Sequence, residues 1–125
     1  MDIVEENELF AGREGDTAKT SSLLECAGLF IYSDVNRQGI LTHWQDKGIE
    51  ESLRNALFQL KLRDPYAIIA GCGVPIECLV DDSQTYQEVR EFLSKERIPI
   101  REEKVGSDHK VELEVRFSDG SYKIN

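Results

Sequence analysis

The chain has 125 residues and a formal charge of −9, with 24 acidic against 15 basic side chains. This length suits one domain with a buried core, and the acidity argues against nucleic acid or an anionic membrane as a partner. Three cysteines, Cys26, Cys72 and Cys78, form no paired framework, which is typical of a reducing compartment.

The first residues, 1–7, are acidic and lack the apolar stretch of a signal peptide. No apolar run in the chain approaches the length of a membrane span. We therefore expect a cytoplasmic protein without membrane insertion.

Residues 1–19 are polar and mixed in charge, and they include two glycines. The apolar runs Ile3-Val4 and Leu9-Phe10-Ala11 give only a weak strand signal. We expect an N-terminal arm over 1–19, partly flexible, followed by a single domain over 20–125.

Two strands joined by a turn-rich link are predicted over 26–33 and 39–44. The first is apolar on both faces, as in a strand covered on both sides. A helix is predicted to open at Asp46-Lys-Gly and to end before Asp64-Pro65. Its buried stripe has helical spacing and comprises Ile49, Leu53, Ala56, Leu57 and Leu60.

The second half predicts a buried strand over 66–70, a tight turn over 71–75, and a helix over 84–95 capped by Asp82-Ser83. A strand then starts at residue 98, and a hairpin closes the chain around Asp119-Gly120. Strands and helices alternate without regular βαβ order. The predicted class is therefore α+β, a layered β-sandwich or mixed sheet flanked by two helices.

Cys26 and His43 carry the chemistry that the sequence suggests. They lie seventeen positions apart, but adjacent strands joined by a short link can bring them together. A thiol beside an imidazole is a nucleophile beside a base, which indicates a cysteine hydrolase.

Thr20 precedes Cys26 by six positions, His43 follows Cys26 by seventeen, and the histidine ends the run Gly39-Ile-Leu-Thr-His. With these spacings and this order of elements, the chain resembles the chemoreceptor glutamine deamidase family CheD. The likeness extends over roughly 18–124 and is strongest around these three residues. The same fold also resembles the catalytic domain of cytotoxic necrotising factor, a toxin deamidase.

The resemblance implies a cysteine amidohydrolase that converts a surface glutamine of a protein substrate to glutamate, in a chemotaxis receptor or another signalling protein. Cys26 would be the nucleophile, His43 the base and Thr20 the group that orients the ring. We expect His43 as imidazolium to stabilise a Cys26 thiolate. We expect the amides of Glu25 and Cys26 to form an oxyanion hole, without cofactor or metal.

One stretch departs from the family. Where the family is glycine-rich before its cysteine, this chain reads Ser21-Ser22-Leu23-Leu24-Glu25, which narrows the approach to the thiol and places a carboxylate beside it. The alternatives that follow are a non-catalytic module that docks a regulatory protein, and a toxin-type effector deamidase.

A metal site is the other arrangement that the sequence suggests. Cys72, Cys78 and His109 carry metal-binding side chains, but their spacing fits no standard ligand pattern. We therefore expect no metal.

Overall fold

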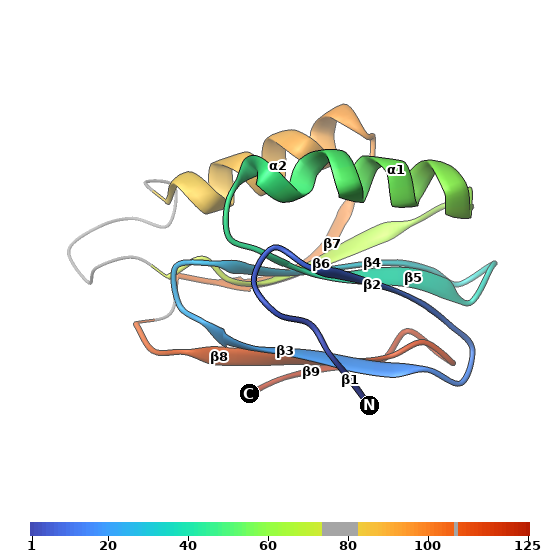
Figure 1. The fold of residues 1–125 in the computed structure, drawn as a ribbon, viewed down its shortest axis with the longest axis horizontal. Helices are drawn as coiled ribbons and strands as arrows, with labels where there is room; N and C mark the ends of the chain where they lie inside the picture. Colours follow the sequence, from blue (N-terminus) through green and yellow to red (C-terminus); the bar gives the residue numbers. More distant parts are fainter. Residues whose placement is uncertain (74–82, 107) are drawn as a thin grey trace.

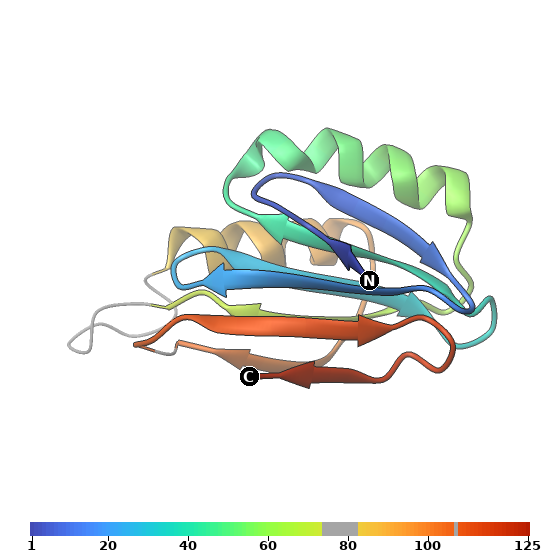
Figure 2. The same ribbon diagram turned by 60° about the horizontal axis from the view of Figure 1, so that its bottom comes forward.

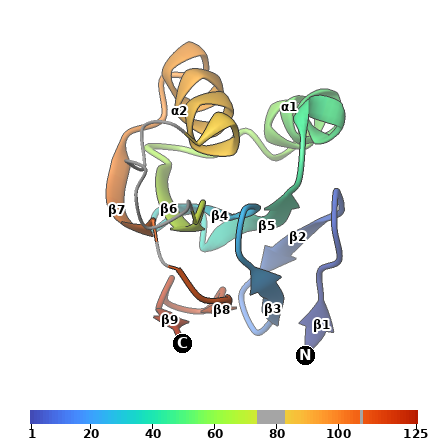
Figure 3. The ribbon, with the colours of Figure 1, turned by 90° about the vertical axis from the view of Figure 1, so that its left-hand side faces the viewer.

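A computed structural model describes residues 1–73, 83–106 and 108–125 of the chain. Its elements form three layers: two helices, a five-stranded sheet and a four-stranded sheet (Figure 1). Seen along the strands, both helices cover the outer face of the five-stranded sheet, and the smaller sheet covers its other face (Figure 3). The predicted α+β class, with layered sheets and two flanking helices, is confirmed.

The five-stranded sheet has the order β2-β5-β4-β6-β7. Its strands are β2 (Leu9–Arg13), β4 (Ala27–Ser33), β5 (Gln38–Trp44), β6 (Tyr66–Gly71) and β7 (Ile100–Val105). The central strand β4 is buried along its whole length. Other layers cover both faces of β4, which explains why its sequence is apolar without alternation.

The four-stranded sheet has the order β1-β3-β8-β9. Its strands are β1 (Asp2–Ile3), β3 (Thr17–Leu23), β8 (Val111–Arg116) and β9 (Tyr122–Ile124). β8 and β9 form the predicted C-terminal hairpin, and its turn contains Gly120 at a φ of 73°. The two sheets enclose a core of aromatic and aliphatic side chains that includes Phe30, Leu41, Leu113 and Phe117.

The helices begin and end close to the predicted residues. A short 3-10 helix η1 (Lys47–Ile49) leads into α1 (Glu50–Leu60), and Asp46 caps η1 through Gly48 N. α2 (Gln84–Lys95) is capped by Ser83, whose Oγ accepts from Tyr86 N at 3.2 Å. Asp82, the other predicted cap residue, lies outside the described residues.

Within residues 1–19, where we expected an N-terminal arm, β1, β2 and the start of β3 contribute to the two sheets. β1 pairs in parallel with β3, and β2 pairs antiparallel with β5 (Figure 2). Val4 is buried, and its amide donates to Lys19 O at 2.9 Å. The apolar pairs near residues 3 and 10 are too short to predict strands alone, and they form strands here because neighbouring strands offer unpaired edges.

In the part of the chain described here, neither helix has the length and apolar character required to span a membrane.

Candidate active site

The pairing of β4 with β5 determines how the candidate residues face one another. Gly28 lies opposite His43 and Ala27 opposite Trp44. Side chains alternate between the two faces of a strand. His43 therefore projects toward the four-stranded sheet, whereas Trp44 projects toward the helices and packs against Phe92, with ring centroids 5.6 Å apart.

Thr20 and His43 are in direct contact. His43 Nδ1 lies 2.7 Å from Thr20 Oγ1, and the Thr20 hydroxyl itself donates to Val4 O at 2.8 Å. Because the hydroxyl proton is committed to Val4, Thr20 Oγ1 accepts the hydrogen bond and Nδ1 carries the ring proton. This arrangement selects the tautomer in which Nε2 has a free lone pair, as a general base requires.

A β-bulge follows Thr20. Thr20 pairs with Leu113 and Leu23 with Val111, so β3 has one extra residue between these pairs. Ser22 takes up the bulge in the left-handed region, at a φ of 59°. Bulges of this kind redirect a strand next to functional sites, and this one separates the Thr20 position from the turn that carries Cys26.

Cys26 lies immediately before β4 and is partly exposed. It packs against the core between the sheets, on the same face as Gly28 two residues later. It is therefore a diagonal neighbour of His43 across the β4–β5 pair. The predicted strand pairing is confirmed, and the thiol and the imidazole lie on one face.

His43 Nε2 is buried and has no hydrogen-bond partner among the residues that the structure describes. The side chain as a whole is 3% exposed. A buried polar atom without a partner costs about 1–3 kcal/mol and calls for a functional or structural explanation. Thus Thr20 and His43 are joined by a hydrogen bond, whereas Cys26 and His43 share a face without one.

The pKa shifts of the thiol and the ring run against the expectation of a thiolate–imidazolium pair. Burial raises the pKa of Cys26, and the carboxylates of Glu6, Glu25 and Asp46 raise it further. Burial lowers the pKa of His43. Both shifts favour the neutral forms, because a charge is less stable away from water and a thiolate is repelled by nearby anions.

The loop after β6 holds the backbone on both sides of Cys26. Cys72 N donates to Cys26 O at 2.9 Å, and Gly73 N donates to Leu24 O. Among the described residues, the amides of Glu25 and Cys26 donate to no backbone carbonyl. These two amides, predicted to form an oxyanion hole, are therefore not taken up by the backbone pairing of the sheets.

The three residues considered for a metal occupy different environments. Cys72 is buried on the helix side of the sheet, where burial raises the pKa of its thiol to about 12. His109 is exposed, with Nδ1 3.2 Å from Asp108 Oδ1. Cys78 lies outside the described residues. In the described ranges, no three His, Cys, Asp or Glu side chains group as metal ligands.

Three residues that position the site have no distinctive sequence signal. Val4 supplies the carbonyl for Thr20. Gly28 lies opposite His43, and a Cβ there would come within 3.3 Å of Thr20 Cγ2. The backbone N–H of Asn7 donates to His43 O at 2.9 Å. Their roles depend on backbone atoms and missing atoms, which residue type alone does not reveal.

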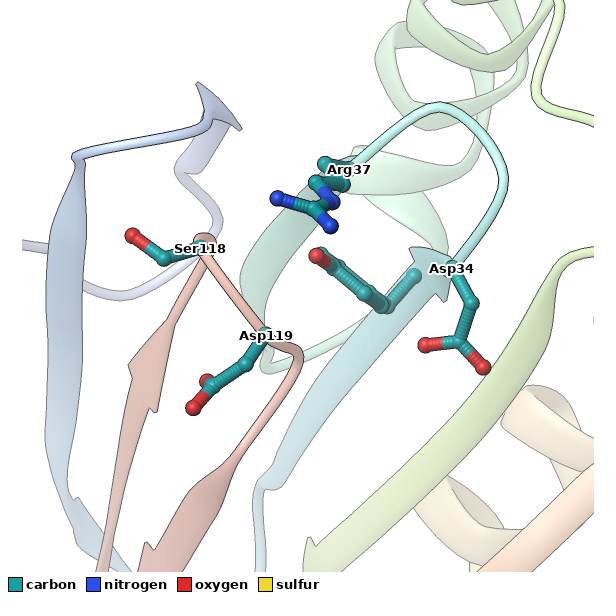
Figure 4. Close-up of a pocket in the computed structure, with 5 residues that line it drawn as sticks. Asp34, Arg37, Ser118 and Asp119 are labelled. Atoms are coloured by element: carbon teal, nitrogen blue, oxygen red, sulfur yellow. The ribbon is translucent and has the colours of Figure 1, made fainter.

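A pocket of about 360 Å³ lies at the opposite end of β4. It is formed between the β4–β5 turn, with Asp34 and Arg37, and the β8–β9 turn, with Ser118 and Asp119 (Figure 4). Its polar groups already have partners: Arg37 pairs with Glu14 at 2.9 Å, and Ser118 Oγ accepts from Gly15 N. We therefore place the candidate site at the Cys26 end.

Comparison with models of protein families finds no match to the chain, and comparison with curated proteins finds none either.

Proposed function

We propose that the chain is a cysteine-dependent protein glutamine deamidase, with Cys26 as nucleophile and His43 as general base. The observation that carries the proposal is the hydrogen bonding of the two ring nitrogens of His43. Its Nδ1 is bound by Thr20, and its buried Nε2 is unpartnered on the face that carries Cys26. A ring held in one tautomer with its basic nitrogen free is what a general base requires. Cys26 is partly exposed, as a nucleophile that meets a substrate requires.

The first half of the reaction forms a thioester. His43 Nε2 removes the Cys26 proton as the sulfur attacks the glutamine carbonyl carbon, so that the thiolate exists only when a substrate is in place. The protonated Nε2 then gives that proton to the leaving nitrogen, the C–N bond breaks, and ammonia departs. Thr20 Oγ1 accepts a hydrogen bond from the Nδ1–H group throughout, and this bond stabilises the imidazolium that forms.

The second half hydrolyses the thioester. Nε2 removes a proton from water, the hydroxyl oxygen attacks the carbonyl carbon, and the C–S bond breaks. The proton on His43 returns to the Cys26 sulfur. One amide and one water thus become one carboxylic acid and one ammonia, and the protein is unchanged. A thiol nucleophile that must stay reduced is consistent with a cytoplasmic location.

Contacts of this kind are often long in the free enzyme and shorten when substrate binds. This accounts for the absent sulfur–nitrogen hydrogen bond. It also explains how a thiol with a raised pKa can act, because the proton transfer accompanies the attack rather than preceding it.

The test uses a pool of peptides from a digested bacterial lysate, incubated with the protein and analysed by mass spectrometry. Deamidation adds about 1 Da at each modified glutamine, because a hydroxyl replaces an amino group in the thioester route. We expect defined glutamine sites to be modified by the wild type and by H109Q, and by neither C26A nor H43Q. Modification that persists in C26A at the same sites would refute the proposal.

A second function, a non-catalytic module that docks a regulatory protein, is favoured by one observation, the raised pKa of Cys26. An inactive protein needs no ionisable thiol. The two functions are separated by trapping with an electrophilic glutamine analogue such as 6-diazo-5-oxo-norleucine. A deamidase labels Cys26 faster in the wild type than in H43Q, whereas a module labels it at the same slow rate in both.

A further inference from the structure

Four carboxylates lie close enough to Cys26 or His43 to act on one or both of them electrostatically. Glu5 and Glu6 lie in the turn after β1, Glu25 precedes Cys26, and Asp46 follows β5 by two residues. All four side chains belong to exposed residues. We call this set the acidic rim.

Asn7 holds two parts of the acidic rim together. Its backbone N–H donates to His43 O at 2.9 Å. Its side-chain Oδ1 accepts from Gln45 N and Asp46 N at 3.1 and 3.3 Å. Its Nδ2 donates to Asp46 Oδ1 at 3.0 Å. The turn that carries Glu5 and Glu6 is therefore fixed against the end of β5, beside His43.

The charge of the acidic rim is not neutralised by the described residues. None of the four carboxylates takes part in an ion pair with a described Lys or Arg. The acidic rim therefore presents net negative charge to anything that approaches Cys26.

The unpartnered Nε2 of His43 is the second, independent indication that a ligand binds here. This nitrogen belongs to a side chain 97% removed from solvent, and it has no partner among the described residues. Glu6 acts electrostatically on both Cys26 and His43, so this member of the acidic rim lies near the sulfur and the ring.

We propose that the acidic rim selects substrates in which the reacting carboxamide is flanked by positive charge, so that the target is a glutamine next to lysine or arginine on a basic protein surface. Opposite charges close to a site raise the local concentration of a cationic partner. The same charge repels glutamate, the product, and favours its release. This inference rests on the proposed deamidation, and it names the substrate class of that site.

The first experiment measures charge selection without catalysis. Cys26 is modified with two methanethiosulfonate reagents of similar size, one carrying trimethylammonium and one carrying sulfonate. Rates are read by mass spectrometry from the tryptic peptide 20–37, which contains no other cysteine. The variant E6Q/E25Q removes half of the acidic rim. The matched control E51Q/E102Q changes net charge equally, on α1 and β7.

The readout is the ratio of the modification rate with the cationic reagent to the rate with the anionic one. We expect this ratio to be about tenfold higher in the wild type and the control than in E6Q/E25Q. This preference should fall toward that of E6Q/E25Q in 1 M salt, where charges are screened within a few ångströms. Equal preferences in the wild type and E6Q/E25Q would overturn the inference. An equally reduced preference for the cationic reagent in E51Q/E102Q would also overturn the inference, because the net charge of the protein alone would then be responsible.

The second experiment measures ammonia release from two peptides, Lys-Ala-Gln-Ala-Lys and Glu-Ala-Gln-Ala-Glu. We expect at least about tenfold higher kcat/KM for the lysine peptide in the wild type, and a smaller ratio in E6Q/E25Q. Equal turnover of both peptides would show that the acidic rim does not select for positive charge, although the proposed deamidation would stand. Charge-selective labelling with no turnover of either peptide would overturn deamidation, and the acidic rim would remain a cation-selective surface.

Discussion

The 2.7 Å contact between Thr20 Oγ1 and His43 Nδ1 joins the two sheets of the protein at the candidate site. Thr20 belongs to β3 of the four-stranded sheet, and His43 belongs to β5 of the five-stranded sheet. One hydroxyl therefore orients the ring and connects two layers, and Val4 O completes the chain of hydrogen bonds.

The substitution T20V tests this contact, because valine keeps the shape and removes the hydroxyl. Two buried groups, the ring N–H and Val4 O, lose their partner, which should destabilise the protein by about 1–3 kcal/mol. Glutamine turnover should fall at least tenfold, since the tautomer is no longer fixed. Urea unfolding and nitrogen-15 chemical shifts of His43 measure the two effects. T20S, which restores the hydroxyl, should recover the tautomer, and a T20S spectrum like that of T20V would contradict the assignment.

The lowered pKa of His43 predicts how stability depends on pH. The folded ring binds its proton at a pH below the ordinary 6.5, so between those two values the unfolded chain holds more protons. The free energy of unfolding should therefore decrease as the pH falls from 7.5 to 5.5. The pKa values of Glu91, Glu112 and Asp119 are also lowered, but they affect stability only below about pH 4.5.

Urea midpoints at the two pH values provide the measurement. H43Q should remove most of the decrease between pH 7.5 and 5.5, since the buried titrating ring is gone. H109Q is the matched control and should keep it. A decrease of the same size in H43Q would mean that another group is responsible.

Alkylation of Cys26 by iodoacetamide distinguishes a neutral pair from a thiolate–imidazolium pair. Burial and three carboxylates raise the pKa of Cys26, so the reaction midpoint should lie above that of a free thiol. E25Q should lower the midpoint, because one repelling charge is removed. H43Q should leave it unchanged. A midpoint that lies well below the free-thiol value and rises in H43Q would show that the ion pair exists.

The elements were predictable from the sequence because their signals are local. The helical stripe and Ser83 define α2, and the alternation in Val111–Arg116 defines β8. The pairing of β4 with β5 also follows from local signals, since two strands with a short link tend to pair. The role of residues 1–19 was not predictable, because β1 and β2 are stabilised by long-range pairing rather than by their own composition.

The spacing of Thr20, Cys26 and His43 predicted that the fold brings these side chains near one another, and Thr20 and His43 are hydrogen-bonded. Their charge states could be predicted only in part. The protonation states depend on burial and on Glu6 and Asp46, which approach through the tertiary fold. Electrostatic neighbours of this kind come from distant parts of the chain, so the expected ion pair could not be assessed from the sequence alone.

Gly28 provides the last prediction, because it lies directly opposite His43. A Cβ at this position would be 2.7 Å from Leu23 Cδ1 and 3.3 Å from Thr20 Cγ2. G28A should therefore destabilise the protein by about 1–3 kcal/mol through overpacking. It should also reduce glutamine turnover, because the strand that carries Thr20 must shift away from the ring.

A double-mutant cycle separates overpacking from other effects of the added methyl group. L23A removes the nearest contact atom, so in G28A/L23A the cost of G28A should be smaller than in the wild type, with a coupling of about 0.5–3 kcal/mol by urea unfolding. The nitrogen-15 shifts of His43 in the double variant should return toward those of L23A alone. Additive effects of the two substitutions would show that Gly28 does not control the spacing between the sheets at this site.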